Sequence, residues 1–77
     1  MTPEPMVVRN RLKEARLEKG LTQESLASTI GVTRQTVIAV EKGKFVPSVK
    51  LALELAWALG LPIAEIFWLD SSAGAGT

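Results

Sequence analysis

The chain has 77 residues, and its nine lysine or arginine and eight aspartate or glutamate residues give a formal net charge of +1 at pH 7. It has no cysteine and no histidine, which excludes disulfides and thiolate metal sites and removes the commonest metal ligand and general base. A hydrophobic fraction of 47% is ordinary for a globular protein, and the length fits one domain with a small core.

The two ends of the chain differ in composition from its middle. Residues 1–5 include two prolines and are predicted to be a flexible leader, and the Gly/Ala/Ser-rich residues 71–77 are predicted to be a disordered tail. The start does not resemble a signal peptide, and the longest apolar stretch, 51–68, contains two glutamates and a proline. We therefore expect a single domain over residues 6–70, in a cytoplasmic protein without a membrane partner.

Capping residues predict the helices. Helices are expected from Asn10 to Lys19, after a Thr22 cap to about Ile30, after a Thr33 cap to about Glu41, from Val49 to Leu59 after a Ser48 cap, and from Pro62 through Glu65 or Ile66. Glycines follow the first four, at positions 20, 31, 43 and 60. The apolar runs 6–8 and 67–69 have β character. The sequence therefore predicts an all-α fold of five short helices, in which the two end runs can pair as a small antiparallel sheet.

The segment from Leu21 to Lys44 is the most informative part of the sequence. Two capped helices are separated by Ile30–Thr33, a turn with a central glycine that sets helices at a steep angle, as in a DNA-binding helix-turn-helix. Residues 33–50 carry four bases against one acid, whereas residues 51–77 carry three acids and no base. This local basic excess favours double-stranded DNA as the partner.

The outer side of the helix after this turn carries residues suited to reading base edges. Gln35 can pair bidentately with adenine, Arg34 can reach guanine or a phosphate, and Thr36 can bond a base or phosphate oxygen. Ile38 and Ala39 offer only apolar contacts to thymine methyl groups, so Gln35 and Arg34 are the main candidates for specificity. Phosphate contacts are expected from Gln23, Lys42, Lys44 and Ser48. The alternative for the glutamine and the lysines is an ordinary solvated surface.

These residues also match a known pattern. It consists of Leu12-x-x-x-Arg16, Gly20-Leu21-Thr22-Gln23-x-x-Leu26-Ala27, Gly31-Val32, Thr33-Arg34-Gln35-Thr36-Val37, Glu41-x-Gly43-Lys44 and Pro47-Ser48. Over about residues 9–67 the chain resembles the Cro/lambda-repressor-like (XRE) helix-turn-helix family, and within it the compact single-domain repressors of the cytolysin-repressor type. The resemblance implies a five-helix lambda-repressor-like core and a homodimer on a palindromic operator. It places DNA contacts at Gln23, Thr33, Arg34, Gln35, Thr36, Ile38, Ala39 and Lys44.

Two charged residues, Arg16 and Glu41, sit next to core positions on helices expected to pack together. We interpret them as a structural ion pair and not as a catalytic one.

The helix from Val49 to Leu59 is apolar almost all round, although a helix at the edge of a small monomer should have one solvent-exposed face. We expect a dimer interface near it. Its predicted residues are Trp57, Ile66, Phe67, Trp68 and Leu69. The alternative is that the terminal strands cover this surface.

The sequence favours a DNA-binding transcriptional regulator, most simply a repressor. The alternative is an antitoxin or a protein-interaction module that uses the same fold. An enzyme is not expected, because no nucleophile–base pair or phosphate loop can be assembled from this composition. We also expect no cofactor, no metal and no small-molecule ligand.

Overall fold

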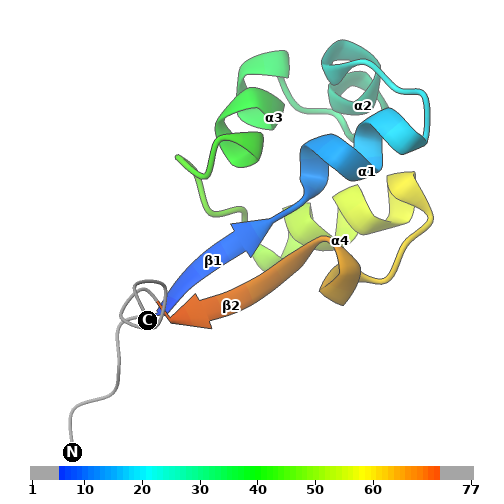
Figure 1. The fold of residues 1–77 in the computed structure, drawn as a ribbon. Helices are drawn as coiled ribbons and strands as arrows, with labels where there is room; N and C mark the ends of the chain where they lie inside the picture. The colour runs from blue at the N-terminus through cyan, green and yellow to red at the C-terminus, as the bar shows by residue number, and fades with distance from the viewer. Residues whose placement is uncertain (1–5, 72–77) are drawn as a thin grey trace, which may run out of the picture.

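A computed structural model of the chain describes residues 6–71, so the predicted leader and residues 72–77 of the predicted tail lie outside the described residues. Four helices stack beside a two-stranded sheet formed by the two ends of the described chain (Figure 1). In chain order the elements are β1 (Met6–Asn10), α1 (Leu12–Glu18), α2 (Gln23–Ile30), α3 (Arg34–Glu41), α4 (Val49–Leu59), a 3₁₀ turn η1 (Ile63–Glu65) and β2 (Phe67–Ser71).

Side-chain caps start three of the helices where the sequence predicts them. The Thr22 hydroxyl accepts from the Ser25 backbone N–H at 2.9 Å, and the Ser25 hydroxyl accepts from the Thr22 N–H at 2.9 Å, a reciprocal capping box at α2. The Thr33 hydroxyl caps α3, and the Ser48 hydroxyl caps α4 by accepting from Leu51 N–H at 3.1 Å. The predicted limits of α2, α3 and α4 are confirmed.

Helix α1 starts later than predicted. Asn10 is not its N-cap but the last residue of β1, and the helix begins at Leu12. The Asn10 carboxamide still accepts a hydrogen bond from the Leu12 N–H at 3.0 Å, while its NH₂ group donates to the Val40 carbonyl at 2.9 Å. This one side chain therefore joins the sheet to the start of α1 and to α3.

The predicted fifth helix is wrong, because η1 is a single 3₁₀ turn. Its bonds run from Glu65 N to Pro62 O at 3.0 Å and from Ile66 N to Ile63 O at 2.9 Å, each spanning three residues. The chain then leaves the turn because Ile66 enters the core and its carbonyl accepts from Arg11 N at 2.9 Å. The described chain thus has four α-helices, and the segment after Pro62 bends into β2 before a longer helix can form.

The two apolar end runs pair as the predicted antiparallel sheet. Met6 lies opposite Ser71, Val8 opposite Leu69 and Asn10 opposite Phe67. Ser71 is therefore the last residue of a strand and not the first of a tail, which corrects that boundary. An exposed ion pair between Arg9 and Asp70, at 3.3 Å, crosses the strands.

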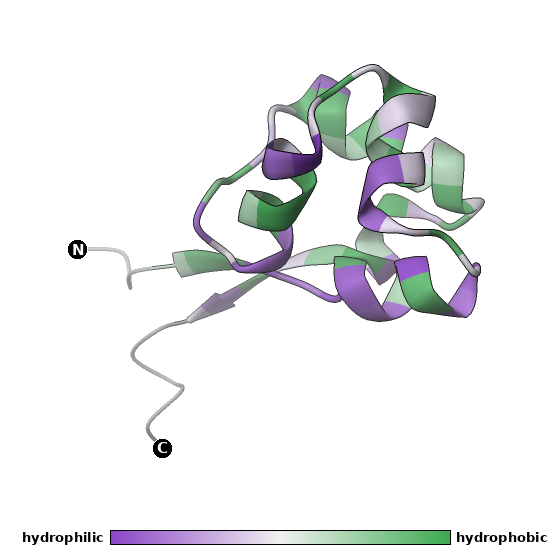
Figure 2. Cartoon of the chain, turned by 90° about the horizontal axis from the view of Figure 1, so that it is seen from above, coloured by the Kyte–Doolittle hydropathy of each residue, from purple (hydrophilic) through white to green (hydrophobic). Residues whose placement is uncertain are grey.

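All four helices and the turn before β2 contribute to one core. Its members are Leu12, Ala15, Leu26, Ala27, Val37, Val40, Leu55, Ala56, Leu59 and Ile66. Hydrophobic and hydrophilic segments alternate along the helices (Figure 2), as expected for helices that each turn one face inward. Within residues 6–71, no helix is long and apolar enough to cross a membrane.

Candidate nucleic-acid interface

The turn between α2 and α3 is held by backbone bonds and one left-handed glycine. Gly31 has φ of 75°, its N–H donates to Ser28 O at 3.3 Å, and the Val32 N–H donates to Ala27 O at 3.0 Å. Thr33 then caps α3 directly, so only three residues separate the two helices. Both helices bury apolar residues in the shared core, which leaves the opposite side of α3 facing outward.

The outer side of α3 presents two long polar side chains to solvent. Arg34 and Gln35 are exposed, whereas Thr36, Ile38 and Ala39 are half-buried. The Thr36 hydroxyl lies 3.1 Å from that of Thr33, within the cap at the start of the helix. The two predicted readers thus have the freedom to reach a base edge, while their neighbours present shorter side chains close to the helix.

Arg16 and Glu41, predicted to pair, form a buried ion pair that joins α1 to the end of α3. Arg16 Nε lies 2.6 Å from Glu41 Oε2, and the two side chains are only 7% and 5% exposed. Arg16 Nη1 also donates to the Leu21 carbonyl at 2.9 Å. Gln23 Nε2 donates to Glu41 Oε1 at 3.1 Å. The network therefore connects α1, the loop after it, the first residue of α2 and the last residue of α3.

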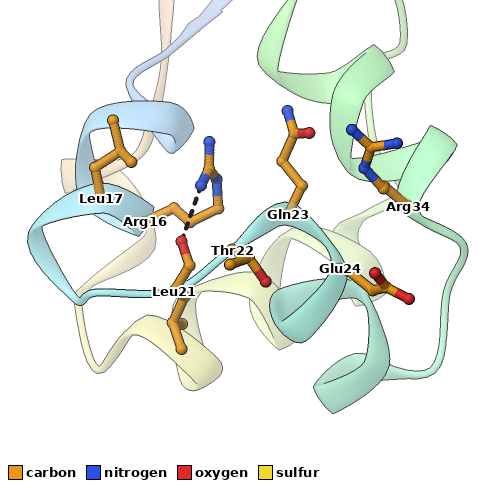
Figure 3. A pocket seen from close by; sticks show the side chains of 7 residues that line it. All are labelled: Arg16, Leu17, Leu21, Thr22, Gln23, Glu24 and Arg34. Carbon is orange, nitrogen blue, oxygen red and sulfur yellow. Dashed lines mark hydrogen bonds between the residues drawn. The ribbon is translucent and has the colours of Figure 1, made fainter.

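Gln23, predicted to contact DNA phosphate, lies at the edge of this network and in an open depression of about 580 Å³ (Figure 3). In this view Gln23 stands between Arg16, from α1, and Arg34, from α3. One N–H of Gln23 is held by Glu41, so its second N–H is the one available to a ligand. Arg34 has no ion-pair partner among residues 6–71 and faces the same depression.

The loop after α3 carries the other predicted phosphate contacts. Backbone bonds from Gly43 N to Val40 O, at 3.0 Å, and from Lys44 N to Ala39 O, at 2.9 Å, close the end of the helix. Lys42, Lys44 and Ser48 are all exposed. The Ser48 hydroxyl uses its oxygen to cap α4, which leaves its proton for an outside acceptor.

The residues predicted for a dimer surface do not all lie on the surface. Trp57 is 76% exposed, Trp68 and Leu69 are also exposed, and Phe67 is half-buried. Ile66 is fully buried in the core of its own chain, so its assignment to an interface is wrong. Its position directly after η1 turns it inward, whereas the alternation of β2 turns the following residues to both faces of the sheet.

Sequence reasoning missed two features beside α3 and one on α4. Asn10 fixes the end of α3 through the Val40 carbonyl, and Phe45 lies exposed in the loop that follows α3. Val49 and Leu53 are exposed and precede Trp57 by eight and four residues, which places all three on one face of α4. Only the stripe on α4 could have been found, by counting its apolar residues in steps of four.

The described residues offer no metal site, since no group of three or more acidic side chains comes together within 6–71. Every fully buried side-chain nitrogen or oxygen in this part of the chain has a hydrogen-bond partner.

Comparisons with known proteins agree with this arrangement. A family model described as helix-turn-helix matches residues 12–66. The HTH-type transcriptional regulator YgzD of Bacillus subtilis is 48% identical over 63 residues, which cover 82% of this chain and 96% of that protein. The phage CTXphi transcriptional repressor RstR of Vibrio cholerae is 39% identical over 57 residues, covering 74% of this chain and 51% of RstR.

A solved structure gives the same result for the fold. The restriction-modification controller protein C.AhdI from Aeromonas hydrophila superposes with a TM-score of 0.68 at 44% identity, covering 71% of this chain and 80% of that one. The match of the family model to most of the chain, together with these relatives, leads to one conclusion. The chain belongs to the XRE-type helix-turn-helix family of DNA-binding transcriptional regulators.

Proposed function

We propose that this chain is a cytoplasmic repressor that binds a palindromic operator as a homodimer, with α3 in the major groove. The observation that carries the proposal is the pair of exposed side chains on α3, Arg34 and Gln35, with phosphate-binding candidates on neighbouring elements. Gln23, at the start of α2, lines the same depression as Arg34, and Lys44 and Ser48 are exposed after α3. A reading helix needs such contacts to both flanking backbones to hold its register on the duplex.

The base-reading chemistry follows from the side chains on α3. The Gln35 carboxamide can donate to adenine N7 and accept from N6–H, while Arg34 can donate to guanine or to a phosphate. The backbone N–H groups at the start of α2 and the positive end of its dipole favour a phosphate beside Gln23. The second N–H of Gln23 is already oriented because Glu41 holds the first.

A homodimer is supported by the apolar surface that the single chain leaves uncovered. The stripe Val49–Leu53–Trp57 on α4, together with Trp68 and Leu69, is a large exposed apolar area for so small a monomer. A two-fold dimer would present two copies of α3 to half-sites about one helical turn apart, roughly 34 Å. The sign of regulation is proposed as negative because RstR, which is similar, is a transcriptional repressor.

The decisive experiment is selection of duplexes from a random pool with the full chain, followed by gel-shift titration and a reporter assay. We expect enrichment of one inverted repeat, binding that weakens steeply with salt, and lower reporter expression when the repeat overlaps a promoter. Enrichment of no sequence, with no binding to any duplex at low salt, would contradict the proposal. It would favour a protein-interaction role for the same fold.

A further inference from the structure

Phe45 is a large apolar side chain in the basic segment, and it remains 46% exposed. The loop that carries it is short and constrained at both ends. The bond from Lys44 N to Ala39 O fixes its start, and Pro47 followed by the Ser48 cap fixes its end. The ring is therefore held beside α3 by a backbone with little freedom.

Phe45 lines a shallow groove with three residues of α3. The groove has a volume of about 360 Å³, and its walls are Gln35, Thr36, Ala39, Phe45 and Leu51. Most of its exposed wall is apolar, and three of its five lining residues, Ala39, Phe45 and Leu51, have purely hydrocarbon side chains. The groove opens next to Gln35, so whatever Gln35 contacts at a base edge lies next to an apolar recess.

We infer that this groove receives the 5-methyl group of a thymine in the operator, and that Phe45 is a specificity-determining residue for that base. The inference rests on the proposed function and adds a residue and a chemical group to it. In the major groove only thymine presents a methyl group, and burying this group in a carbon-lined recess is favourable because it removes apolar surface from water. If Gln35 reads an adenine, the paired thymine carries its methyl group in the same base pair.

The surrounding charges agree with DNA as the occupant. Lys42 and Lys44 are exposed on the same loop, and Arg34 is exposed on the same helix. Cations on the same loop and helix as an apolar recess suit a ligand whose backbone is anionic and whose reading edge bears a methyl group. The groove is also continuous with the base-reading face, because Gln35 belongs to both.

The experiment replaces each thymine of the selected operator, one at a time, with deoxyuridine, which lacks only the methyl group. For the unmodified chain, we expect at least one position per half-site at which the replacement weakens binding about fourfold, the value of one buried methyl group. The Phe45→Ala variant should bind the thymine and deoxyuridine duplexes equally at that position. Phe45→Leu, which restores an apolar side chain, should recover most of the preference.

Val46→Ala is the matched control, because Val46 is exposed on the same loop but does not line the groove. It should keep the thymine preference of the unmodified chain. The inference is overturned if no thymine is sensitive to deoxyuridine, if Phe45→Ala keeps the preference, or if Val46→Ala loses it equally. These outcomes differ from failure of the proposed function, in which no duplex would be selected at all.

Discussion

Gln35 is the exposed carboxamide on α3, and its two hydrogen-bonding atoms can address one adenine at a time. Gln35→Ala should therefore lower discrimination between the selected operator and a copy altered at that base pair by about 1–3 kcal/mol. Competition gel shifts with the two duplexes measure this difference. An unchanged ratio of affinities would contradict a reading role.

Lys44→Ala is the control for that measurement. Lys44 is exposed in the loop after α3 and is proposed to bind a phosphate, which is the same for every sequence. The variant should weaken binding to both duplexes alike and reduce the slope of log affinity against log salt by about 1. If Lys44→Ala changed the discrimination between the two duplexes and left the salt slope unaltered, Lys44 would be a base-reading residue and not a phosphate contact.

Arg16 shows how much one buried charge depends on its partner. Arg16→Met leaves the Glu41 carboxylate buried with only the Gln23 amide as a partner, so we expect a loss of about 3–5 kcal/mol in the free energy of unfolding. Urea denaturation measures the loss. The double variant Arg16→Met/Glu41→Leu should recover much of it, because both charges are then absent. If Arg16→Met alone were as stable as the unmodified chain, the ion pair would not contribute to the stability of the fold.

At the scale of elements, the turn between α2 and α3 depends on the backbone of Gly31 and not on space around it. A Cβ at Gly31 would have no neighbour within 4 Å, yet its φ of 75° is unfavourable for other residues. Gly31→Ala should destabilise the fold by about 1–2 kcal/mol. Thermal unfolding should show a midpoint lower by roughly 4–8 °C per kcal/mol. Gly31→Asn should lose less because asparagine tolerates this conformation, and equal losses would contradict the explanation.

The helices could be predicted because their limits are set locally. Thr22, Thr33 and Ser48 each cap the helix that follows within three residues, and these contacts require no knowledge of the rest of the fold. The segment after Pro62 was mispredicted because its outcome is decided elsewhere. Ile66 is drawn into a core made by all four helices, and its carbonyl is taken by Arg11, 55 positions earlier in the chain.

In the candidate site, too, some features follow from the local sequence and others depend on tertiary contacts. The periodicity of α3 was enough to predict that Arg34 and Gln35 are exposed, since it puts Val37 and Val40 inside. The role of Asn10 and the groove beside Phe45 could not be predicted. Each depends on how a loop or strand is placed against α3, which is a tertiary contact without a local pattern in the sequence.

At the scale of the whole molecule, the uncovered stripe on α4 predicts self-association. Trp57→Glu places a charge at the most exposed large apolar residue of the described chain. In sedimentation at micromolar concentration, the unmodified chain should have about twice the 8.3 kDa mass of one chain, and the variant the mass of a monomer. Leu17→Glu, a similar change at an exposed leucine on α1, should leave the mass unaltered. A monomeric unmodified chain would remove the basis for the dimer.

The pairing of Met6 with Ser71 has a consequence for the order of folding. The ladder joins residues from the two ends of the described chain, so closing it early would carry a large entropic penalty. The helices, whose bonds are local, can form first and bring the strands together. We therefore expect substitutions such as Val8→Ala to leave the refolding rate nearly unaltered and to speed unfolding, as stopped-flow kinetics would show. The sheet would then form late in folding, and its stability would set the unfolding rate and so the lifetime of the folded state.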